Sequence, residues 1–160
     1  FSSTSVDLTL DPTLSIFAAP QPGVESVIDP GHAEFDHEAV LAQLTQSITI
    51  SDVGFLFKPG QLILAWTKET VNLKTDARLA ARVEGKSSLA RLGIGVHVTA
   101  PTIHAGFKGQ IRLEMYNHGK VPVRLRAGMK ICQLILEQTL GTPMQGYAGR
   151  FSGQTMAKRG

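Results

Sequence analysis

Residues 85–93 of the chain read GKSSLARLG, and two further segments follow, VHVTA at 96–100 and GFKGQIRLE at 106–114. The first segment places one cation, Lys86, and two hydroxyls directly after a glycine, at the start of a predicted short helix. Cations, hydroxyls and exposed backbone amides are groups that bind phosphate. The segment therefore predicts a phosphate site, although a serine that caps the helix beside a solvated lysine is an alternative explanation.

The segment 110–116 alternates between apolar and polar residues, which is the pattern of a half-buried strand. One face carries Ile111, Leu113 and Met115, and the other carries Arg112, Glu114 and Tyr116. Because Glu114 shares the polar face, it need not be buried in apolar packing. By itself, the pattern fits an exposed charge pair on a strand as well as a functional carboxylate.

Glycine and proline are frequent, with 16 and 8 residues, and the apolar stretches between them are short and rich in β-branched side chains. This composition is typical of an all-β or β-rich domain with tight turns. The many short strands favour a jelly roll or a distorted barrel. Helix is expected only at Phe35 to Gln46, where a long loop fits nearly as well, and at Ser87 to Leu92. The expected strands are Val6–Leu10, Ser47–Ile50, Gly54–Phe57, Leu62–Thr67, Ala77–Glu84, Gly95–Thr99, Gly109–Asn117, Val121–Leu125 and Lys130–Glu137.

The chain has 160 residues, which fits a single domain. No apolar run approaches the roughly 20 residues of a membrane-spanning helix, and no secretory leader is visible, so we expect a soluble protein without a membrane partner. The single cysteine, Cys132, lies in an apolar run and is expected to be a small buried hydrophobe. One cysteine cannot build a zinc site of the nucleoside-deaminase type. We therefore expect no zinc, and a reducing, cytoplasmic compartment.

The chain carries 16 Lys and Arg against 13 Asp and Glu, a formal net charge of +3. The basic residues between Lys86 and Lys130 are scattered among apolar residues and do not form a run. A small polyanion such as a triphosphate fits this distribution better than nucleic acid does. A solvated basic surface without a ligand is the alternative.

Together, the segments at 85–93, 96–100 and 106–114 resemble the nucleotide site of the trimeric dCTP deaminase and dUTPase superfamily. Within it, SSLARLG at 87–93 and the glutamate of LEMYN at 113–117 resemble the dCTP deaminases. The resemblance covers Ser3 through Gln154 and implies a distorted, jelly-roll-like β-barrel of the dUTPase type for the single domain 1–160. It also implies a homotrimer with active sites between subunits. Because the family usually has a helical segment ahead of SVDL at 5–8, we expect the natural start to precede Phe1.

The resemblance also implies a catalytic group that works without a metal ion. Glu114 corresponds to the general base, which deprotonates the water that attacks C4 of cytosine and passes the proton to the base and the leaving ammonia. The Ser87 hydroxyl and the Ala100 carbonyl correspond to groups that hold this water. Arg91 corresponds to an arginine beside the carboxylate, and an ordinary surface charge is its alternative.

Other residues match positions at which the family contacts the nucleotide. Lys86 stands where an arginine is more usual, so it keeps the charge and lacks the planar fork. The tail 141–160 is expected to be mobile and to close over the nucleotide, and a disordered tail without a role is the alternative. The expected nucleotide-binding residues are Lys86, Ser87, Ser88, Thr102, His104, Arg112, Tyr147, Arg150 and Gln154.

Three positions depart from the family pattern. His104 stands where both branches place an aspartate that contacts the 3′-hydroxyl and, in dUTPases, orients the hydrolytic water. Thr102 replaces an arginine that is frequent in monofunctional deaminases, and Asp11 replaces a glycine. The other histidines match no catalytic motif, and His97, between two valines of an expected strand, is expected to be structural.

These observations predict a dCTP deaminase that forms dUTP and ammonia, takes Mg²⁺ on the triphosphate and has dTTP as a candidate inhibitor. Glu114 favours deamination, whereas the imidazole of His104 argues against efficient phosphate hydrolysis. Two alternatives stay open. One is a bifunctional enzyme or dUTPase-like hydrolase that forms dUMP, and the other is a weakly catalytic, nucleotide-binding regulatory relative.

Overall fold

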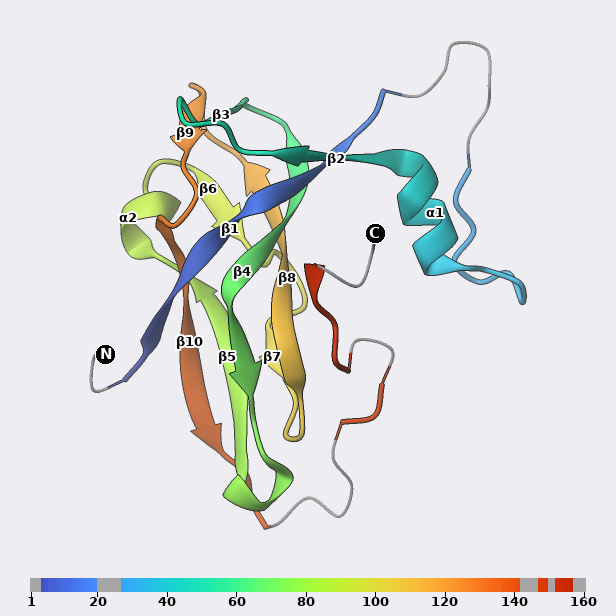
Figure 1. Ribbon diagram of the computed structural model, residues 1–160, viewed down its shortest axis with the longest axis vertical. Coiled ribbons are helices and arrows are strands. Elements are labelled where there is room, and N and C mark those ends of the chain that lie inside the picture. Colours follow the sequence, from blue (N-terminus) through green and yellow to red (C-terminus); the bar gives the residue numbers. More distant parts are fainter. Residues whose placement is uncertain (1–3, 20–26, 142–146, 150–151, 157–160) are drawn as a thin grey trace.

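The computed structural model describes residues 4–19, 27–141, 147–149 and 152–156 (Figure 1). The first half of the chain forms β1 (Val6–Phe17), α1 (His37–Leu44), β2 (Thr45–Thr49), β3 (Phe55–Phe57), β4 (Leu62–Asn72) and the 3-10 turn η1 (Thr75–Ala77). The second half forms β5 (Leu79–Gly85), α2 (Ser87–Ala90), β6 (Ile94–Val96), β7 (Thr102–Ile103), β8 (Lys108–Asn117), β9 (Val123–Leu125) and β10 (Lys130–Gln138).

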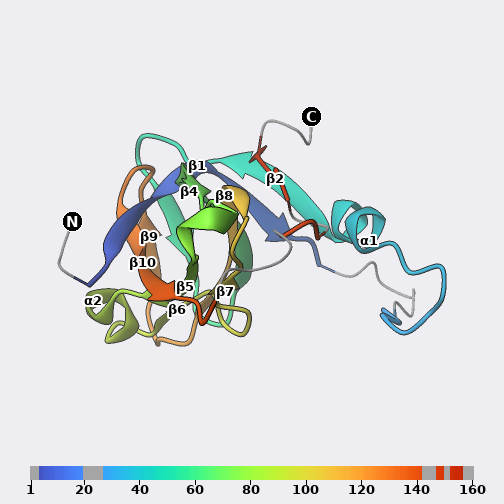
Figure 2. The same cartoon turned by 90° about the horizontal axis from the view of Figure 1, so that it is seen from below.

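One antiparallel sheet contains most of the strands. Its order is β6-β8-β4-β1-β10-β5-β7, with β2 paired to β1, and β3 pairs separately with β9. The first residues of β1 pair with β10, and its later residues pair with β4 and β2. The sheet therefore curls around β1 (Figures 1 and 2). The predicted all-β class and distorted barrel are confirmed.

β1 is irregular where it changes partners. Its register shifts between Leu10 and Leu14, at the proline of the segment Asp11-Pro12-Thr13. Pro12 has no N–H to donate to a ladder, so it is tolerated where regular pairing is interrupted. The Asp11 carboxylate accepts a hydrogen bond from the Thr13 N–H at 2.9 Å. Asp11, which departs from the family's glycine, thus stabilises the bend with its own side chain.

The core lies inside the curled sheet. Leu10, Leu14, Ile63, Ile111 and Leu113 are almost completely buried, with exposed fractions of 1% or less. Cys132 is also fully buried, and burial raises the pKa of its thiol to about 12. The prediction that Cys132 is a small buried hydrophobe is therefore confirmed. On β8 every second residue points into this core, which leaves the alternate residues facing outward.

Each predicted strand is present, although β5 and β9 begin two residues later than expected and β2 begins at Thr45, inside the expected helix. Three further differences have a physical cause. β1 and β4 run further than expected, because register shifts let them continue past the irregular residues. β6 ends at Val96, since His97 takes a left-handed backbone conformation with φ +58°. β7 is a two-residue strand that no apolar alternation in the sequence indicated. The first helix begins at His37 because Asp36 caps it by accepting from the Glu38 and Ala39 N–H groups.

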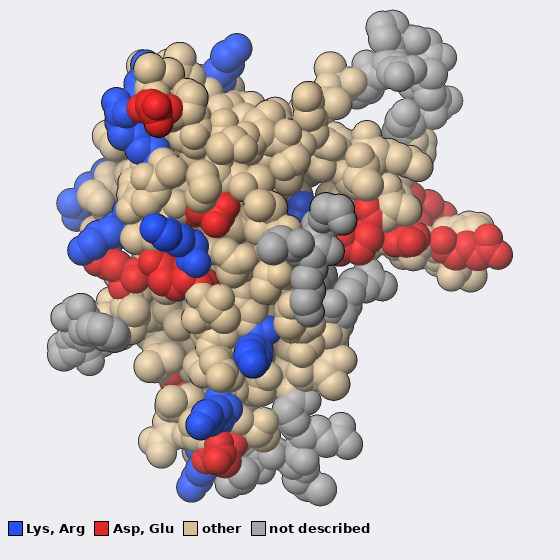
Figure 3. Space-filling view, in the orientation of Figure 1, with Lys and Arg blue, Asp and Glu red and all other residues tan. Residues whose placement is uncertain are grey.

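The surface of the described residues adds two observations. No helix among them is both long enough and apolar enough to cross a membrane. On the left and lower parts of the face shown in Figure 3, Lys and Arg side chains are interspersed with Asp and Glu, whereas the projection on the right carries Asp and Glu. This distribution agrees with the scattered basic residues of the sequence.

Asn117 is a fully buried polar residue at the end of β8. Its amide donates to the carbonyls of Phe57 at 2.8 Å and Val121 at 3.2 Å. Its carbonyl oxygen accepts from the Gly119 N–H at 2.9 Å. The side chain therefore joins the end of β3, the end of β8 and the turn that follows, where buried backbone groups need partners.

We predict that Asn117→Ala lowers the free energy of unfolding by about 2–4 kcal/mol, because it leaves buried backbone groups without partners. Urea unfolding followed by circular dichroism measures the change. Asn72→Ala, at an exposed position of β4, is the matched control and should change stability by about 0.5 kcal/mol or less. Equal effects of the two substitutions would contradict the role assigned to Asn117.

Candidate functional site

A cavity of about 390 Å³ lies beside the outward face of β8. Segments distant in sequence line it, namely α1, the loop after β6, β7, β8 and the tail beyond residue 146. Seven of the residues predicted for the site line this cavity: Ala100, Thr102, His104, Arg112, Glu114, Tyr147 and Gln154. The fold therefore brings together the predicted general base and most of the predicted nucleotide contacts.

Glu114 is held in the cavity by His97, which also lines it. The His97 N–H donates to the Glu114 carbonyl at 2.7 Å, and His97 Nδ1 lies 3.0 Å from Glu114 Oε2. The imidazole and the carboxylate are therefore in direct contact. The Glu114 side chain as a whole is 39% exposed, whereas Oε2 is buried. One carboxylate oxygen is thus fixed and the rest of the group faces the cavity.

Opposing effects set the protonation of Glu114. Burial raises its pKa, but the contact and charge of His97, its own backbone N–H and the charge of Arg112 lower it. Together the lowering effects outweigh burial, so the pKa of Glu114 lies below its usual range. The side chain is therefore an anion at neutral pH.

His97 lines the cavity and contacts Glu114, which the sequence did not indicate. Its position between two valines predicted a structural residue inside a strand, whereas the residue follows the end of β6 and its side chain is only 6% exposed. Non-glycine residues rarely adopt its left-handed φ of +58°, and such conformations are often found at functional sites. The turn redirects the imidazole toward β8, which no periodicity in the sequence could show.

Arg112 and Glu114 are neighbours on the outward face of β8. The Arg112 guanidinium lies 5.3 Å from the ring centroid of Trp66, which is opposite it on β4. Trp66 is 3% exposed, so this face of the guanidinium rests on a rigid aromatic surface. The arrangement keeps a positive charge at a defined place beside the carboxylate.

His104 and the tail residues Tyr147 and Gln154 also line the cavity. The His104 and Tyr147 rings stack with centroids 5.5 Å apart and an angle of 16° between planes. The Tyr147 N–H donates to the Ala105 carbonyl at 2.9 Å. Tyr147, which matches the tyrosine of the family's tail, therefore lies in the cavity next to His104, which departs from the family pattern.

Gln154 docks on the first residues of β8. The Gln110 N–H donates to the Gln154 carbonyl at 3.0 Å, and the Gln154 amide donates to the Gln110 carbonyl at 2.9 Å. A Cβ at Gly109 would come within 2.6 Å of the Gln154 carbonyl oxygen. Glycine at 109 thus permits the tail to lie against β8.

Four of the predicted site residues, Lys86, Ser87, Ser88 and Arg91, do not line this cavity. α2 lies across the molecule from α1 in both views (Figures 1 and 2), and none of the described residues that line the cavity comes from it. Ser87, Ser88 and Arg91 are exposed there. Within one chain, the predicted water-holding serine and the predicted arginine are therefore not beside Glu114.

Lys86 is not the solvated lysine of the capping alternative. Its ammonium group pairs with Asp7 Oδ1, and the Ser87 and Ser88 side chains do not cap α2, whose N-cap is Lys86 itself. Arg150 lies outside the described residues. Among the residues that are described, no group of three or more His, Cys, Asp or Glu could hold a metal ion.

Comparisons with known proteins agree on one family. A family model described as dCTP deaminase-like matches residues 1–139. The chain is 38% identical to a dUMP-forming dCTP deaminase of Methanosphaera stadtmanae, over 83% of this chain and 69% of that protein. It is 40% identical to a dCTP deaminase of Idiomarina loihiensis, over 75% of this chain and 61% of that protein.

One solved structure supports the architecture. The 2′-deoxycytidine 5′-triphosphate deaminase from Agrobacterium tumefaciens aligns with a TM-score of 0.63 over 84% of this chain and 39% of that chain. At 23% sequence identity, the alignment shows that the two chains share a fold.

The contact between His97 and Glu114 makes a measurable prediction. We expect His97→Asn to raise the pKa of Glu114, because burial then acts without the opposing contact and charge of the imidazole. Asparagine is chosen because it tolerates a left-handed φ. A pH titration of the ¹³C-labelled glutamate carboxyls by NMR measures the change.

The control for this experiment is His118→Asn. The His118 ring lies 4.5 Å from the Tyr116 ring and belongs to the turn after β8. The titration of Glu114 should be the same in this variant as in the wild type. A pKa of Glu114 that stays unchanged in His97→Asn would refute the role given to His97.

Proposed function

The chain belongs to the dCTP deaminase-like family, and on that premise we propose that it deaminates dCTP by hydrolysis, with Glu114 as the general base. The observation that carries the proposal is the position of Glu114, an anionic carboxylate with one fixed oxygen and one side open to a cavity. A cavity lined by apolar groups and a few polar groups is the usual form of a small-ligand site.

Each proton has a defined path in the proposed reaction. Glu114 takes a proton from water as the oxygen attacks C4 of cytosine, and the C4–N bond then breaks with the proton transferred to the leaving ammonia. A carboxylate with a lowered pKa is a weak base while the cavity is empty. Binding of the nucleotide removes water and raises the pKa of Glu114, which strengthens it as a base.

Mg²⁺ enters this proposal only with the substrate. The triphosphate carries the ion, which neutralises part of the phosphate charge, and the protein supplies lysine and hydroxyl groups for the remainder. The candidate groups are Lys86, Ser87 and Ser88 near α2, with Thr102, His104, Arg112, Tyr147, Arg150 and Gln154 for the rest of the nucleotide. dTTP, a related triphosphate, is the inhibitor we would test first.

The product we propose is dUTP. An aspartate at position 104 would be a fixed anion suited to orienting a water for attack on phosphate, whereas an imidazole accepts at one nitrogen and donates at the other. His104 also has one ring face against Tyr147, which restricts its movement. Release of dUMP is the second candidate, because the Methanosphaera stadtmanae relative is named as dUMP-forming.

We predict that Glu114→Gln lowers kcat for dCTP deamination by about 10²- to 10⁴-fold and changes dCTP affinity by less than about tenfold, because the amide keeps the shape but cannot accept the proton. Chromatography of the reaction products measures turnover and separates dUTP from dUMP. Glu137→Gln is the control, since Glu137 pairs with Arg82 on the surface of β10. Full turnover by Glu114→Gln would exclude Glu114 as the base, and dUMP as the main wild-type product would favour the bifunctional candidate.

We further propose that the active site is completed between subunits of a homotrimer. Ser87 begins α2 and Arg91 is the residue after it, and neither lines the cavity that contains Glu114, so in this proposal a second copy supplies them. The ring of three subunits then has three equivalent sites, each with Glu114 from one chain and α2 from the next.

Mixing two inactive variants tests this arrangement. We expect Glu114→Gln and Ser87→Ala each to be inactive alone, and equal amounts unfolded and refolded together to regain about a quarter of wild-type activity. Random mixing makes about three quarters of the trimers mixed, and each mixed trimer has one intact site in three. Mass spectrometry shows whether mixed trimers have formed. If mixed trimers form and regain no activity, Glu114 and Ser87 belong to the site of one chain.

A further inference from the structure

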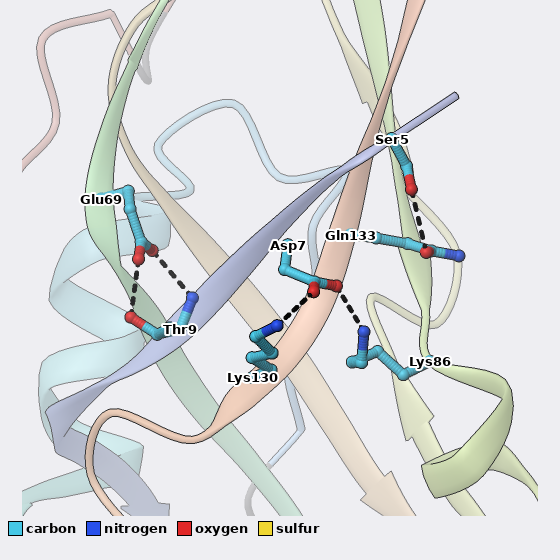
Figure 4. A network of polar contacts seen from close by, with 7 residues as sticks. All are labelled: Ser5, Asp7, Thr9, Glu69, Lys86, Lys130 and Gln133. Carbon is cyan, nitrogen blue, oxygen red and sulfur yellow. Dashed lines mark hydrogen bonds and ion pairs between the residues drawn. The ribbon is translucent and has the colours of Figure 1, made fainter. Parts of the chain in front are cut away.

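Asp7 binds two lysines at once, on the side of the barrel that carries α2. Its Oδ1 pairs with the Lys86 ammonium group, and its Oδ2 lies 2.9 Å from Lys130 Nζ (Figure 4). The carboxylate comes from β1, Lys86 follows β5, and Lys130 is the first residue of β10. Three separate segments thus converge on one carboxylate.

The charges of this cluster do not cancel. Hydrogen bonds from Lys86 and Lys130 lower the pKa of Asp7 to about 2, so its single negative charge persists throughout the physiological range. Two ammonium groups therefore leave one positive charge in excess. The neighbouring carboxylate, Glu69, faces Thr9 and accepts from its N–H at 2.8 Å and from its hydroxyl at 2.7 Å (Figure 4).

The strands fix the spacing of the two lysines. In the pairing of β1 with β10, Asp7 is opposite Gln133 and Thr9 is opposite Lys130. In the pairing of β10 with β5, Cys132 is opposite Gly85, the residue before Lys86. The Lys86 side chain is 24% exposed and that of Lys130 is 65% exposed. Lys86 is thus largely ordered against the barrel, while Lys130 extends into solvent beside it.

We propose that Lys130 is a second phosphate-binding cation of the nucleotide site, and that Asp7 is the positioning residue that holds Lys86 and Lys130 on either side of one carboxylate. The inference rests on the proposed function, in which Lys86 binds the triphosphate. An ammonium group has three N–H donors, so each lysine can contact Asp7 and still donate to phosphate oxygens. Ordering both flexible side chains before binding reduces the entropy lost when the phosphates arrive.

Lys130→Met tests the first part of the inference. We expect the KM for dCTP and the dissociation constant for inorganic tripolyphosphate to rise about fivefold or more, because a charge-assisted contact is lost. The kcat for dCTP and the affinity for dCMP, which lacks the two outer phosphates, should stay within about twofold. Steady-state kinetics and calorimetry measure these quantities, with Lys58→Met at an exposed loop position as the control.

Asp7→Asn tests the positioning role, because two explanations predict opposite signs. If Asp7 merely competed with phosphate for the lysines, removal of its charge would strengthen binding of tripolyphosphate. Since we infer that it orders them, we expect binding to weaken about fivefold, with folding checked by thermal unfolding. Tighter binding by Asp7→Asn would overturn its positioning role.

The outcomes separate this inference from the proposed function. If the wild type turns over dCTP and Lys130→Met matches it in KM and in tripolyphosphate affinity, the inference fails and the deaminase proposal stands. If the wild type binds tripolyphosphate through Lys130 and turns over no dCTP, the phosphate site stands and the deaminase proposal fails.

Discussion

The antiparallel ladder between β4 and β8 decides which side chains of β8 enter the core and which reach the cavity. Leu64 is opposite Glu114 and Trp66 is opposite Arg112, so the strand's charged residues share one face. A shift of one residue would turn every side chain to the other face, burying the charges and exposing Ile111 and its apolar neighbours. Burial of the apolar face therefore fixes the position of the charged face, and both the cavity and its carboxylate depend on this register.

The bulge in β4 preserves that register where the strand is irregular. Pairing shifts between Trp66 and Thr70, and the buried Thr67 hydroxyl fills the gap. It accepts from the Ile111 N–H at 2.9 Å and donates to the Glu69 carbonyl at 3.0 Å. A buried backbone group without a hydrogen-bond partner would destabilise the fold. Because the Thr67 hydroxyl bonds these two backbone groups, the ladder can stay in register on both sides of the bulge.

The charged groups fall into two separate sets. The set on β8 and His97 maintains an anion in a partly buried cavity, whereas the set around Asp7 maintains an excess of positive charge near α2. Proton transfer and phosphate binding need opposite electrostatic environments, and the barrel keeps them on different sides of one chain. In the homotrimer that we propose, the two ends of a nucleotide would be bound by these two sets from neighbouring chains.

Local patterns in the sequence determined the elements, because period-two alternation, glycine and proline act over only a few residues. They predicted the all-β class, the strand at Glu114 and the buried Cys132, and the resemblance of GKSSLARLG predicted the family. Only the tertiary structure decided that His97 turns toward Glu114, that Asp7 binds both Lys86 and Lys130, and that α2 contributes none of the described residues that line the cavity. Each of these depends on a left-handed turn or on the register of strands far apart in the chain, and neither leaves a periodic signal in the sequence.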